Sequence, residues 1–232
     1  MSGRLPPIEI LFVDAHVVVA NKPSGLLVHR GWDDDDDVAM FRVRNAIGQH
    51  VHPLHRLDRG TSGTVAFARS REAAATLSRA FEEGRVEKRY LALVRGTPPE
   101  SGVIDYAIPK DDGGPRVHAV TRFRRISRST VDRCSLVLAT PETGRLHQVR
   151  RHLRHIDHPL IGDVTHGSGV INRRYRAEYA LHRLALHASF LAFDHPATAA
   201  RVEVCAPVPE DLASALAMLG LPLAAPGTQA AR

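Results

Sequence analysis

The sequence predicts an α+β domain whose core is a mixed, largely antiparallel β-sheet flanked by helices. The chain has 232 residues, 44% of them hydrophobic and 24% charged, which is typical of one globular domain with a sizeable core. Short apolar runs bounded by turn residues indicate strands, and a few segments show helical periodicity. These segments do not alternate regularly, as they would in a doubly wound parallel sheet.

Strands are expected where apolar and β-branched residues cluster between turn signals. The expected strands comprise residues 8–13, 16–21, 64–68, 89–95 and 135–139. The sequence KPSG at residues 22–25 and the sequence TSG at residues 61–63 have the residue types of tight turns.

Two helices are expected between these strands. The first has Ser70 as its N-cap and Gly84 as a left-handed C-cap. Its apolar residues recur at helical spacing, namely Ala74, Leu77 and Phe81. The second helix runs from Gly144 and ends before Pro159, with an apolar stripe made by Leu146, Val149, Leu153 and Ile156. A cationic stripe shares this helix and comprises His147, Arg150, Arg151 and Arg154.

The chain has a formal net charge of +6 and an excess of arginine over lysine, because only three of its 31 basic residues are lysines. The codon bias of a GC-rich genome explains such a total, and so does contact with phosphate, which arginine binds bidentately. The position of the charge favours a polyanion, because residues 116–184 carry +9 and the rest of the chain −3. Candidate contacts are Arg122, Arg124, Arg125, Arg128, Arg173, Arg174 and Arg176.

Several classes of protein are disfavoured by composition. Cys134 and Cys205 lie far apart, so neither a disulfide framework nor a cysteine-based zinc site is expected. The histidines at positions 147, 152, 155 and 158 are spaced over different helix faces, so no metal site is expected there. No targeting segment or long apolar run is present, and we expect a cytoplasmic protein without a membrane partner.

The domain organisation is expected to be simple. Residues 1–210 are expected to form one catalytic domain, and residues 211–232 a C-terminal extension whose tail is disordered from about residue 221. The acidic run at residues 33–37 is expected to be a solvated surface loop.

The most specific stretch of the chain is HRLDRGTSG at residues 55–63. Asp58 stands between Arg56 and Arg59, in a loop tightened by two glycines, which is where a preorganised, ionised acid is placed. The alternative interpretation is that Asp58 only forms an ion pair with a neighbouring arginine on the protein surface.

These nine residues match the H-R-L-D-x-x-T-S-G motif of the RluA-type RNA pseudouridine synthases, and the chain resembles that family over about residues 8–208. Further segments match in family order: KPSG at 22–25, KRYLALVRG at 88–96, GRLHQVRRH at 144–152, HPLIGD at 158–163 and LHA at 186–188. A finer likeness, to members that modify tRNA and lack an N-terminal S4 RNA-binding domain, lies in residues 27–30, 47–51, 150–153 and 166–167.

The resemblance implies a pseudouridine synthase catalytic fold and isomerisation of a tRNA uridine, namely uridine 65 of the T stem, after that base is flipped out of its helix. It implies that Asp58 is the essential nucleophilic carboxylate, that Arg150 pairs with it, and that Tyr90 stacks against the target base. It also implies substrate binding by Arg56, Arg145, His147, Gln148 and Leu186, with Arg56 filling the space that the base vacates.

The same resemblance implies tRNA as the partner, with no cofactor, no metal and no obligate protein partner. Two other functions stay open from the sequence. The substrate of the enzyme could be ribosomal RNA, or the chain could be a non-catalytic RNA-binding domain. A carboxylate facing phosphates argues against the second of these, because it gives a pure RNA binder no advantage.

Overall fold

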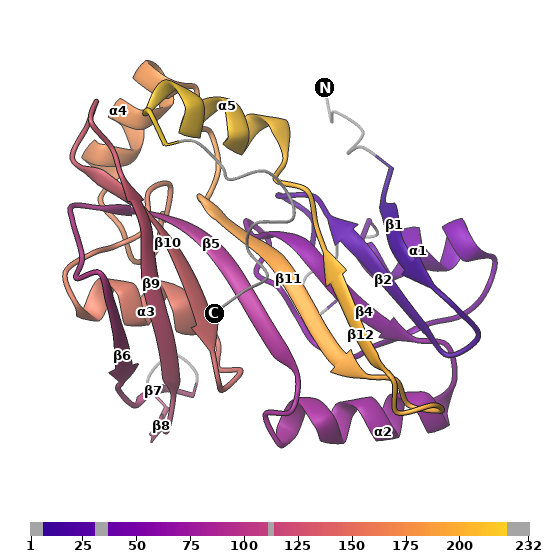
Figure 1. The fold of residues 1–232 in the computed structure, drawn as a ribbon. Coiled ribbons are helices and arrows are strands. Elements are labelled where there is room, and N and C mark those ends of the chain that lie inside the picture. The colour runs from indigo at the N-terminus through magenta and orange to yellow at the C-terminus, as the bar shows by residue number, and fades with distance from the viewer. Residues whose placement is uncertain (1–6, 31–36, 111–113, 222–232) are drawn as a thin grey trace.

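The structure is a computed structural model that describes residues 7–30, 37–110 and 114–221. Its described strands form one ten-stranded sheet and a separate two-stranded ribbon (Figure 1). The strands are β1 Glu9–Val13, β2 Val17–Lys22, β3 His52–Pro53, β4 Ser62–Ala68, β5 Glu87–Arg95, β6 Ser101–Asp105, β7 Ile108–Pro109, β8 Arg116–Val117, β9 Val120–Arg128, β10 Cys134–Pro141, β11 Leu186–Asp194 and β12 Arg201–Cys205. The helices are α1 Ala39–Ile47, α2 Arg71–Glu82, α3 Gln148–His155, α4 Gly169–Tyr179 and α5 Glu210–Met218. A mixed, mostly antiparallel sheet flanked by helices is what the sequence predicts.

The sheet has two halves. Its strand order is β1-β2-β4-β11-β5-β10-β9-β6, with β12 beside β11 and β3 beside β4. One half contains the strands β1, β2 and β4 together with α1 and α2. The other contains β5, β10, β9 and β6 together with α3. In Figure 1 β5 and β11 cross the middle of the sheet, where the two halves meet.

The first expected helix is confirmed as α2. The Ser70 hydroxyl accepts a hydrogen bond from the backbone N–H of Ala73 at 3.2 Å, as an N-cap does. Leu77 is buried on the inner face of the helix, and Gly84 follows its end with a left-handed φ of 72°. Capping chemistry and apolar spacing agree here, so this helix is readable from sequence.

The second expected helix is shorter than its apolar pattern predicts. It begins at Gln148 because His147 has a left-handed φ of 54°, and it ends at His155. Leu146 lies outside the helix and is 37% exposed, so its place in the apolar stripe was wrong. Val149 and Leu153 are buried as expected and pack against Phe123.

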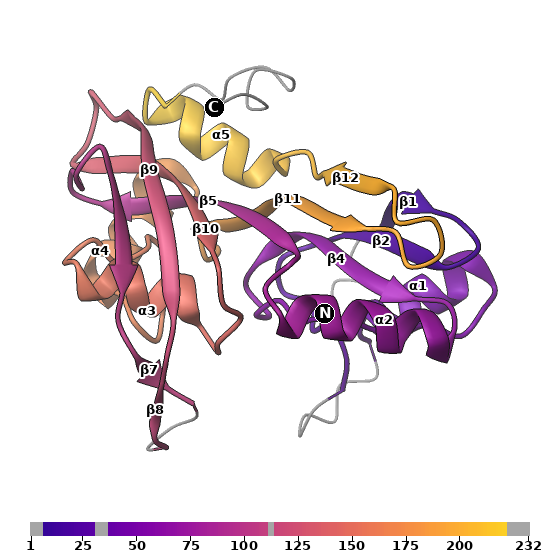
Figure 2. The same ribbon diagram turned by 60° about the horizontal axis from the view of Figure 1, so that its bottom comes forward.

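Alternate residues of β5 point to opposite faces of the sheet. Ala92 and Val94 pack with the residues of α3, whereas Leu91 and Leu93 pack with those of α5. Figure 2 shows α5 on one side of β5 and α3 on the other.

The two halves are joined by β4 and β11, which are the only parallel pair among the strands that the structure describes. Ser62 pairs with His187 and Gly63 with Ala188. Gly63 has a φ of 113°, and a Cβ on it would lie 2.1 Å from the carbonyl oxygen of Ala188. The close approach of the halves therefore requires glycine at this position.

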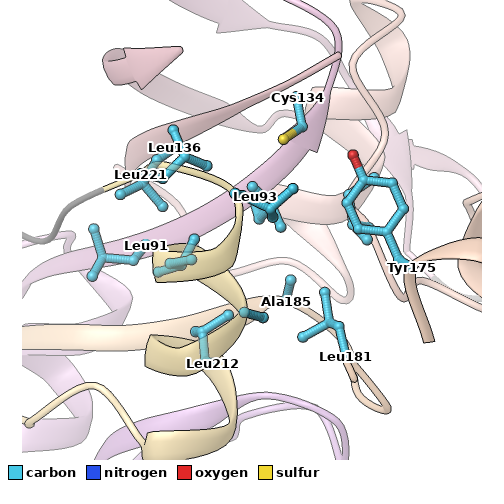
Figure 3. Packing of buried hydrophobic residues seen from close by; sticks show 13 residues of the cluster. Leu91, Leu93, Cys134, Leu136, Tyr175, Leu181, Ala185, Leu212 and Leu221 are labelled. Atoms are coloured by element: carbon cyan, nitrogen blue, oxygen red, sulfur yellow. The ribbon is translucent and has the colours of Figure 1, made fainter. Parts of the chain in front are cut away.

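The C-terminal residues to Leu221 belong to the core. Leu212 and Leu221 are buried in a cluster with Leu93 and Leu136 (Figure 3). Leu216 belongs to the same cluster and is fully buried. Leu221 is fully buried, so the expected tail begins no earlier than residue 222, and residues 222–232 lie outside the described part of the chain. Residues 33–36 of the acidic run also lie outside it. Asp37, the last residue of that run, pairs with Arg42.

Candidate active site

A cleft with a volume of about 1140 Å³ lies where the two halves of the sheet meet. Its walls come from the loop between β3 and β4, from β5 and the start of β11, from the segment leading into α3, and from residues 162–165. All eight site residues expected from sequence line it, namely Arg56, Asp58, Tyr90, Arg145, His147, Gln148, Arg150 and Leu186. The structure thus brings them together, while the role of each stays a prediction.

Asp58 lies in the loop between β3 and β4. Its neighbour Leu57 is 6% exposed and anchors the loop in the core of the N-terminal half. The backbone N–H of Thr61 donates to the carbonyl of Asp58 at 3.0 Å and closes a turn. The Asp58 side chain is 22% exposed in the cleft, and its Oδ2 lies 2.9 Å from Nη1 of Arg150. The two side chains therefore form the ion pair that the family resemblance implies.

The KPSG turn holds the Asp58 loop in place. Lys22 Nζ and the backbone N–H of Gly25 both donate to the carbonyl of Arg59, at 3.2 and 2.8 Å. The Ser24 hydroxyl donates to the carbonyl of Gly60 at 2.8 Å. Lys22 also donates to two carbonyls of its own turn. From sequence this segment was expected to be a turn and to match a family motif, but its contacts with the Asp58 loop were not expected, because they form only in the folded chain.

Lys22 is the charged group most completely buried near the cleft. Its side chain is 0% exposed, and burial lowers the pKa of its ammonium group to about 7. The positive charge of Arg183 lowers this pKa further, and the carboxylate of Asp58 opposes the shift. Lys22 is therefore held by hydrogen bonds at a site where its charge is unfavourable.

Arg150 contacts two carboxylates at once. Its Nε and Nη2 donate to the two oxygens of Asp163, each at 2.8 Å, while Nη1 donates to Asp58. Asp163 is 1% exposed, and its Oδ1 also accepts the backbone N–H groups of Thr165 and His166 at 2.9 Å. Burial alone would raise the pKa of Asp163, but the hydrogen bonds from Arg150 and His166 hold it below the usual value.

Sequence reasoning did not assign Asp163 to the site. The only signal was its position at the end of the HPLIGD segment. Gly162 before it has a φ of 79°, and a Cβ there would lie 1.9 Å from the carbonyl oxygen of Arg183. The turn that aims Asp163 at Arg150 therefore depends on glycine.

Two histidines lie beside Asp58. Nδ1 of His147 is 3.1 Å from Nε2 of His166, and Nε2 of His147 is 3.9 Å from Oδ1 of Asp58. Burial lowers the pKa of His166 to about 4 and also lowers that of His147, against the attraction of Asp58. Both rings are thus neutral at pH 7, so one nitrogen of the pair donates and the other accepts.

Tyr90 lies on β5, half-buried between the cores of the two halves. Burial and the nearby charge of Asp58 both raise the pKa of its hydroxyl. The phenol is therefore protonated at neutral pH, and its ring forms part of the cleft wall.

Gln148 anchors the start of α3. Its Oε1 accepts from the hydroxyl of Thr143 at 2.6 Å and from the backbone N–H of Arg145 at 3.0 Å. Its Nε2 donates to the carbonyl of Val120 and to the hydroxyl of Thr121. The geometry thus supports a positioning role for Gln148, and the substrate contact expected for it stays a prediction.

The arginines of residues 116–184 do not all lie on one surface of the protein. Phe123 of β9 packs on the side of α3, so strand alternation places Arg122 and Arg124 on the opposite face. Arg174 pairs with Asp132 at 2.6 Å, on the side of the sheet where α5 packs. The local charge of +9 is therefore divided between the two faces of the sheet.

In the described ranges, no group of three or more His, Cys, Asp or Glu side chains is placed to hold a metal ion. His152 is instead buried, with its ring nitrogens 2.8 Å from the Thr121 hydroxyl and 2.9 Å from the carbonyl of Tyr106. None of the described helices is long and apolar enough to span a membrane.

The fold and this cleft define a class of RNA-modifying enzyme. Residues 16–155 match the family model described as RNA pseudouridylate synthase, and the chain belongs to that family. It is therefore an isomerase, as its resemblance implied.

Curated relatives refine this membership. The chain is 42% identical over 212 residues to tRNA pseudouridine synthase C of Vibrio parahaemolyticus, covering 82% of this chain and 86% of the relative. It is 40% identical over 235 residues to tRNA pseudouridine synthase C of Salmonella typhimurium, covering 92% of this chain and 90% of the relative.

Solved structures confirm the fold. Human RNA pseudouridylate synthase domain containing 1 superposes with a TM-score of 0.75 at 28% identity, covering 90% of this chain and 86% of that one. Human RNA pseudouridylate synthase domain containing 4 has the same TM-score at 27% identity, covering 93% and 94%.

Proposed function

We propose that this protein converts a uridine of tRNA to pseudouridine, that the site is uridine 65 of the T stem, and that Asp58 is the nucleophile. The ion pair between Asp58 and Arg150, at 2.9 Å within the large cleft, is the observation that carries the proposal. The names of the two bacterial relatives support tRNA as the substrate.

The reaction breaks the N1–C1′ bond of the uridine and forms a C5–C1′ bond. The proton on C5 is lost and N1 gains one, so the product is an isomer and the balance needs no oxidant, reductant or group donor. Asp58 attacks C1′ while ionised, so that an Oδ–C1′ bond forms as the N1–C1′ bond breaks, and C5 of the turned base then displaces the carboxylate from C1′. Arg150 favours the ionised state by pairing with Oδ2. Oδ1 of Asp58 faces His147 at a longer distance of 3.9 Å.

The other residues of the cleft hold the base while it turns. Tyr90 stacks against the uracil ring. The raised pKa of its hydroxyl keeps the phenol neutral, which favours hydrogen bonding over action as a general base. Arg56 is exposed at the cleft and fills the stem position that the flipped nucleotide leaves. Arg145 and His147 bind the same nucleotide, and Leu186 forms an apolar part of the wall.

The test uses Asp58→Asn, which keeps the shape of the side chain and removes its charge. We expect pseudouridine formation in a tRNA transcript to fall at least about a thousandfold, because the covalent step is lost. RNA binding should persist. The control is Asp194→Asn, which removes a carboxylate that is half-exposed on β11 and should leave the rate unchanged.

The assay separates this proposal from the alternatives. Mapping the product in tRNA and in ribosomal RNA transcripts shows which RNA is modified and at which uridine. Modification of ribosomal RNA alone would contradict the tRNA proposal, and RNA binding without any product from the unaltered protein would indicate a binding domain. A normal rate in Asp58→Asn would exclude Asp58 as the nucleophile.

A further inference from the structure

A second, smaller hollow of about 430 Å³ lies at the C-terminal end of α3. Its lining includes Arg95, Arg133, Arg154, His158, His166 and Ser168. Through His166 it borders the His147–His166 pair, whose other side faces the catalytic cleft. Arg95 and His158 belong to segments that match the family motifs, but neither has a role in the reaction proposed above.

The hollow is strongly cationic and its charge is not neutralised. Arg95, Arg133 and Arg154 form no ion pair with any residue that the structure describes, whereas Arg150 on the same helix holds two carboxylates. Asp157 is the only acid within the described lining. The three arginines are exposed around this hollow, and an anion bound among them would reduce their mutual repulsion.

The three arginines are carried by backbone segments that are fixed to one another. The N–H of Gly96 donates to the carbonyl of Arg133 at 2.8 Å, and the N–H of Arg95 donates to the carbonyl of Pro159 at 3.0 Å. Nδ1 of His158 donates to the carbonyl of Arg95 at 2.9 Å. The hollow is therefore a built feature of the fold, formed by β5, the turn before β10 and the end of α3.

A helix terminus independently favours an anion at the same place. Ser168, which lines the hollow, is the N-cap of the eleven-residue helix α4, and its side chain makes no capping hydrogen bond. The first N–H groups of a helix have no partner within the helix and carry a partial positive charge. A phosphate at this end would accept hydrogen bonds from these N–H groups and would pair with the arginines.

We propose that this hollow binds a backbone phosphate of the substrate RNA, outside the nucleotide that enters the cleft. The inference rests on the proposed function for the identity of the RNA. α3 connects the two sites, because His147 lies at the cleft and Arg154 at the hollow, two turns or roughly 10 Å further along the helix. One RNA strand can therefore reach both.

The test is the variant Arg95→Gln/Arg133→Gln/Arg154→Gln. Its control is Arg44→Gln/Arg71→Gln/Arg79→Gln, in which three exposed arginines of α1 and α2 lose the same charge. These control arginines form no ion pair with the described residues and line neither cavity. The dissociation constant for a tRNA transcript is measured for both variants over a range of salt concentrations.

We expect loss of this phosphate contact to weaken binding roughly fivefold at 0.15 M salt, and the magnitude of the salt slope to fall by about 1 in the hollow variant. The KM should rise accordingly, with a far smaller change in the rate at saturating RNA. The control should keep the original salt slope and the original affinity. Equal affinity and equal slope in the two variants would overturn the proposal.

This outcome is separable from a failure of the proposed function. Binding is measured with both tRNA and ribosomal RNA transcripts and does not require turnover. If the unaltered protein forms no pseudouridine in tRNA, the proposed function fails, and the salt slopes still report whether the hollow holds RNA phosphate.

Discussion

Arg150 donates three hydrogen bonds to two carboxylates, and this arrangement fixes the orientation of the Asp58 side chain. Its bidentate pair with Asp163 fixes the plane of the guanidinium group, so the remaining donor points in one direction. Asp58 lies in that direction. A lysine at position 150 would be a point charge and could not be held in this way.

We expect Asp163→Asn to impair both stability and catalysis. Removing one partner of a buried pair costs about 3 to 5 kcal/mol, and a misplaced Arg150 slows the reaction about a hundredfold. Urea denaturation measures the free energy of unfolding, and single-turnover pseudouridine formation measures the rate at a temperature where the variant is folded.

Asp132→Asn is the matched control for that experiment. Asp132 is also shielded from solvent and paired with an arginine, Arg174, but lies away from the cleft. We expect it to lower stability without changing the rate. If Asp163→Asn also loses only stability, Asp163 has no part in positioning Arg150 for the reaction.

The ammonium group of Lys22 makes stability depend on pH. In the unfolded chain the pKa of a lysine is 10.5, whereas in the folded protein Lys22 loses its proton near pH 7. Between these values the unfolded state binds more protons, so the free energy of unfolding rises with pH, by at most about 1.4 kcal/mol per unit. Below pH 7 this contribution is constant.

Lys22→Met should lack this rise. The measurement is urea denaturation of Lys22→Met and of the unaltered protein at pH 6, 8 and 9. The difference between their free energies of unfolding should grow toward pH 9. Lys110→Met, which changes an exposed lysine, should track the unaltered protein at every pH. A constant difference for Lys22→Met would show that Lys22 keeps its proton in the folded state.

The residues in the cleft were predictable because the motifs carry them, whereas their supports were not. Asp58 and Arg150 occupy motif positions 92 residues apart and meet as expected. Lys22 donates to the carbonyl of Arg59, 37 residues away, and Asp163 accepts from the guanidinium of Arg150, 13 residues away. Such contacts exist only after folding, so residue pattern alone does not reveal them.

At the scale of elements, the sequence predicted a helix correctly where its capping residues and its apolar spacing indicated the same bounds. Cap, apolar spacing and terminal glycine all identified α2. The expected start of α3 at Gly144 was wrong. The helix begins at Gln148, because His147 has a left-handed backbone, although the apolar spacing continues back to Leu146. β11 is an apolar run without alternation, and periodicity alone does not distinguish such a strand from a buried helix.

α5 offers a direct test of the core it completes. Leu216 is fully buried against the sheet, whereas Met218 on the same helix is 52% exposed. Leu216→Ala should lower the free energy of unfolding by about 2 to 5 kcal/mol, because it leaves a cavity. Met218→Ala should change it by no more than about 0.5 kcal/mol.

Urea denaturation of the two variants checks this prediction. Similar losses of stability in both would mean that α5 is not fixed against the sheet as Figure 3 shows it. A small loss in both would mean that the C-terminal helix adds little to the core.

At the scale of the molecule, the cleft is a product of the joint between two half-sheets. One half supplies Asp58 and its supporting turn, and the other supplies Tyr90 and Arg150. Fold class and family were predictable from sequence, since they follow from composition and motif order. The distribution of arginine was not, because strand direction decides on which face each side chain lies.

The parallel joint also constrains how the chain is made. Ser62 and His187 are 125 residues apart, so β4 leaves the ribosome long before its neighbour exists. At a synthesis rate of about 5–20 residues per second, the Ser62–Gly63 end of β4 waits roughly 6 to 25 s for its partner strand, while β3 covers only the other end of that edge. During that time the edge is exposed to mispairing with other chains, and a nascent protein has half of its catalytic site but no means of using it.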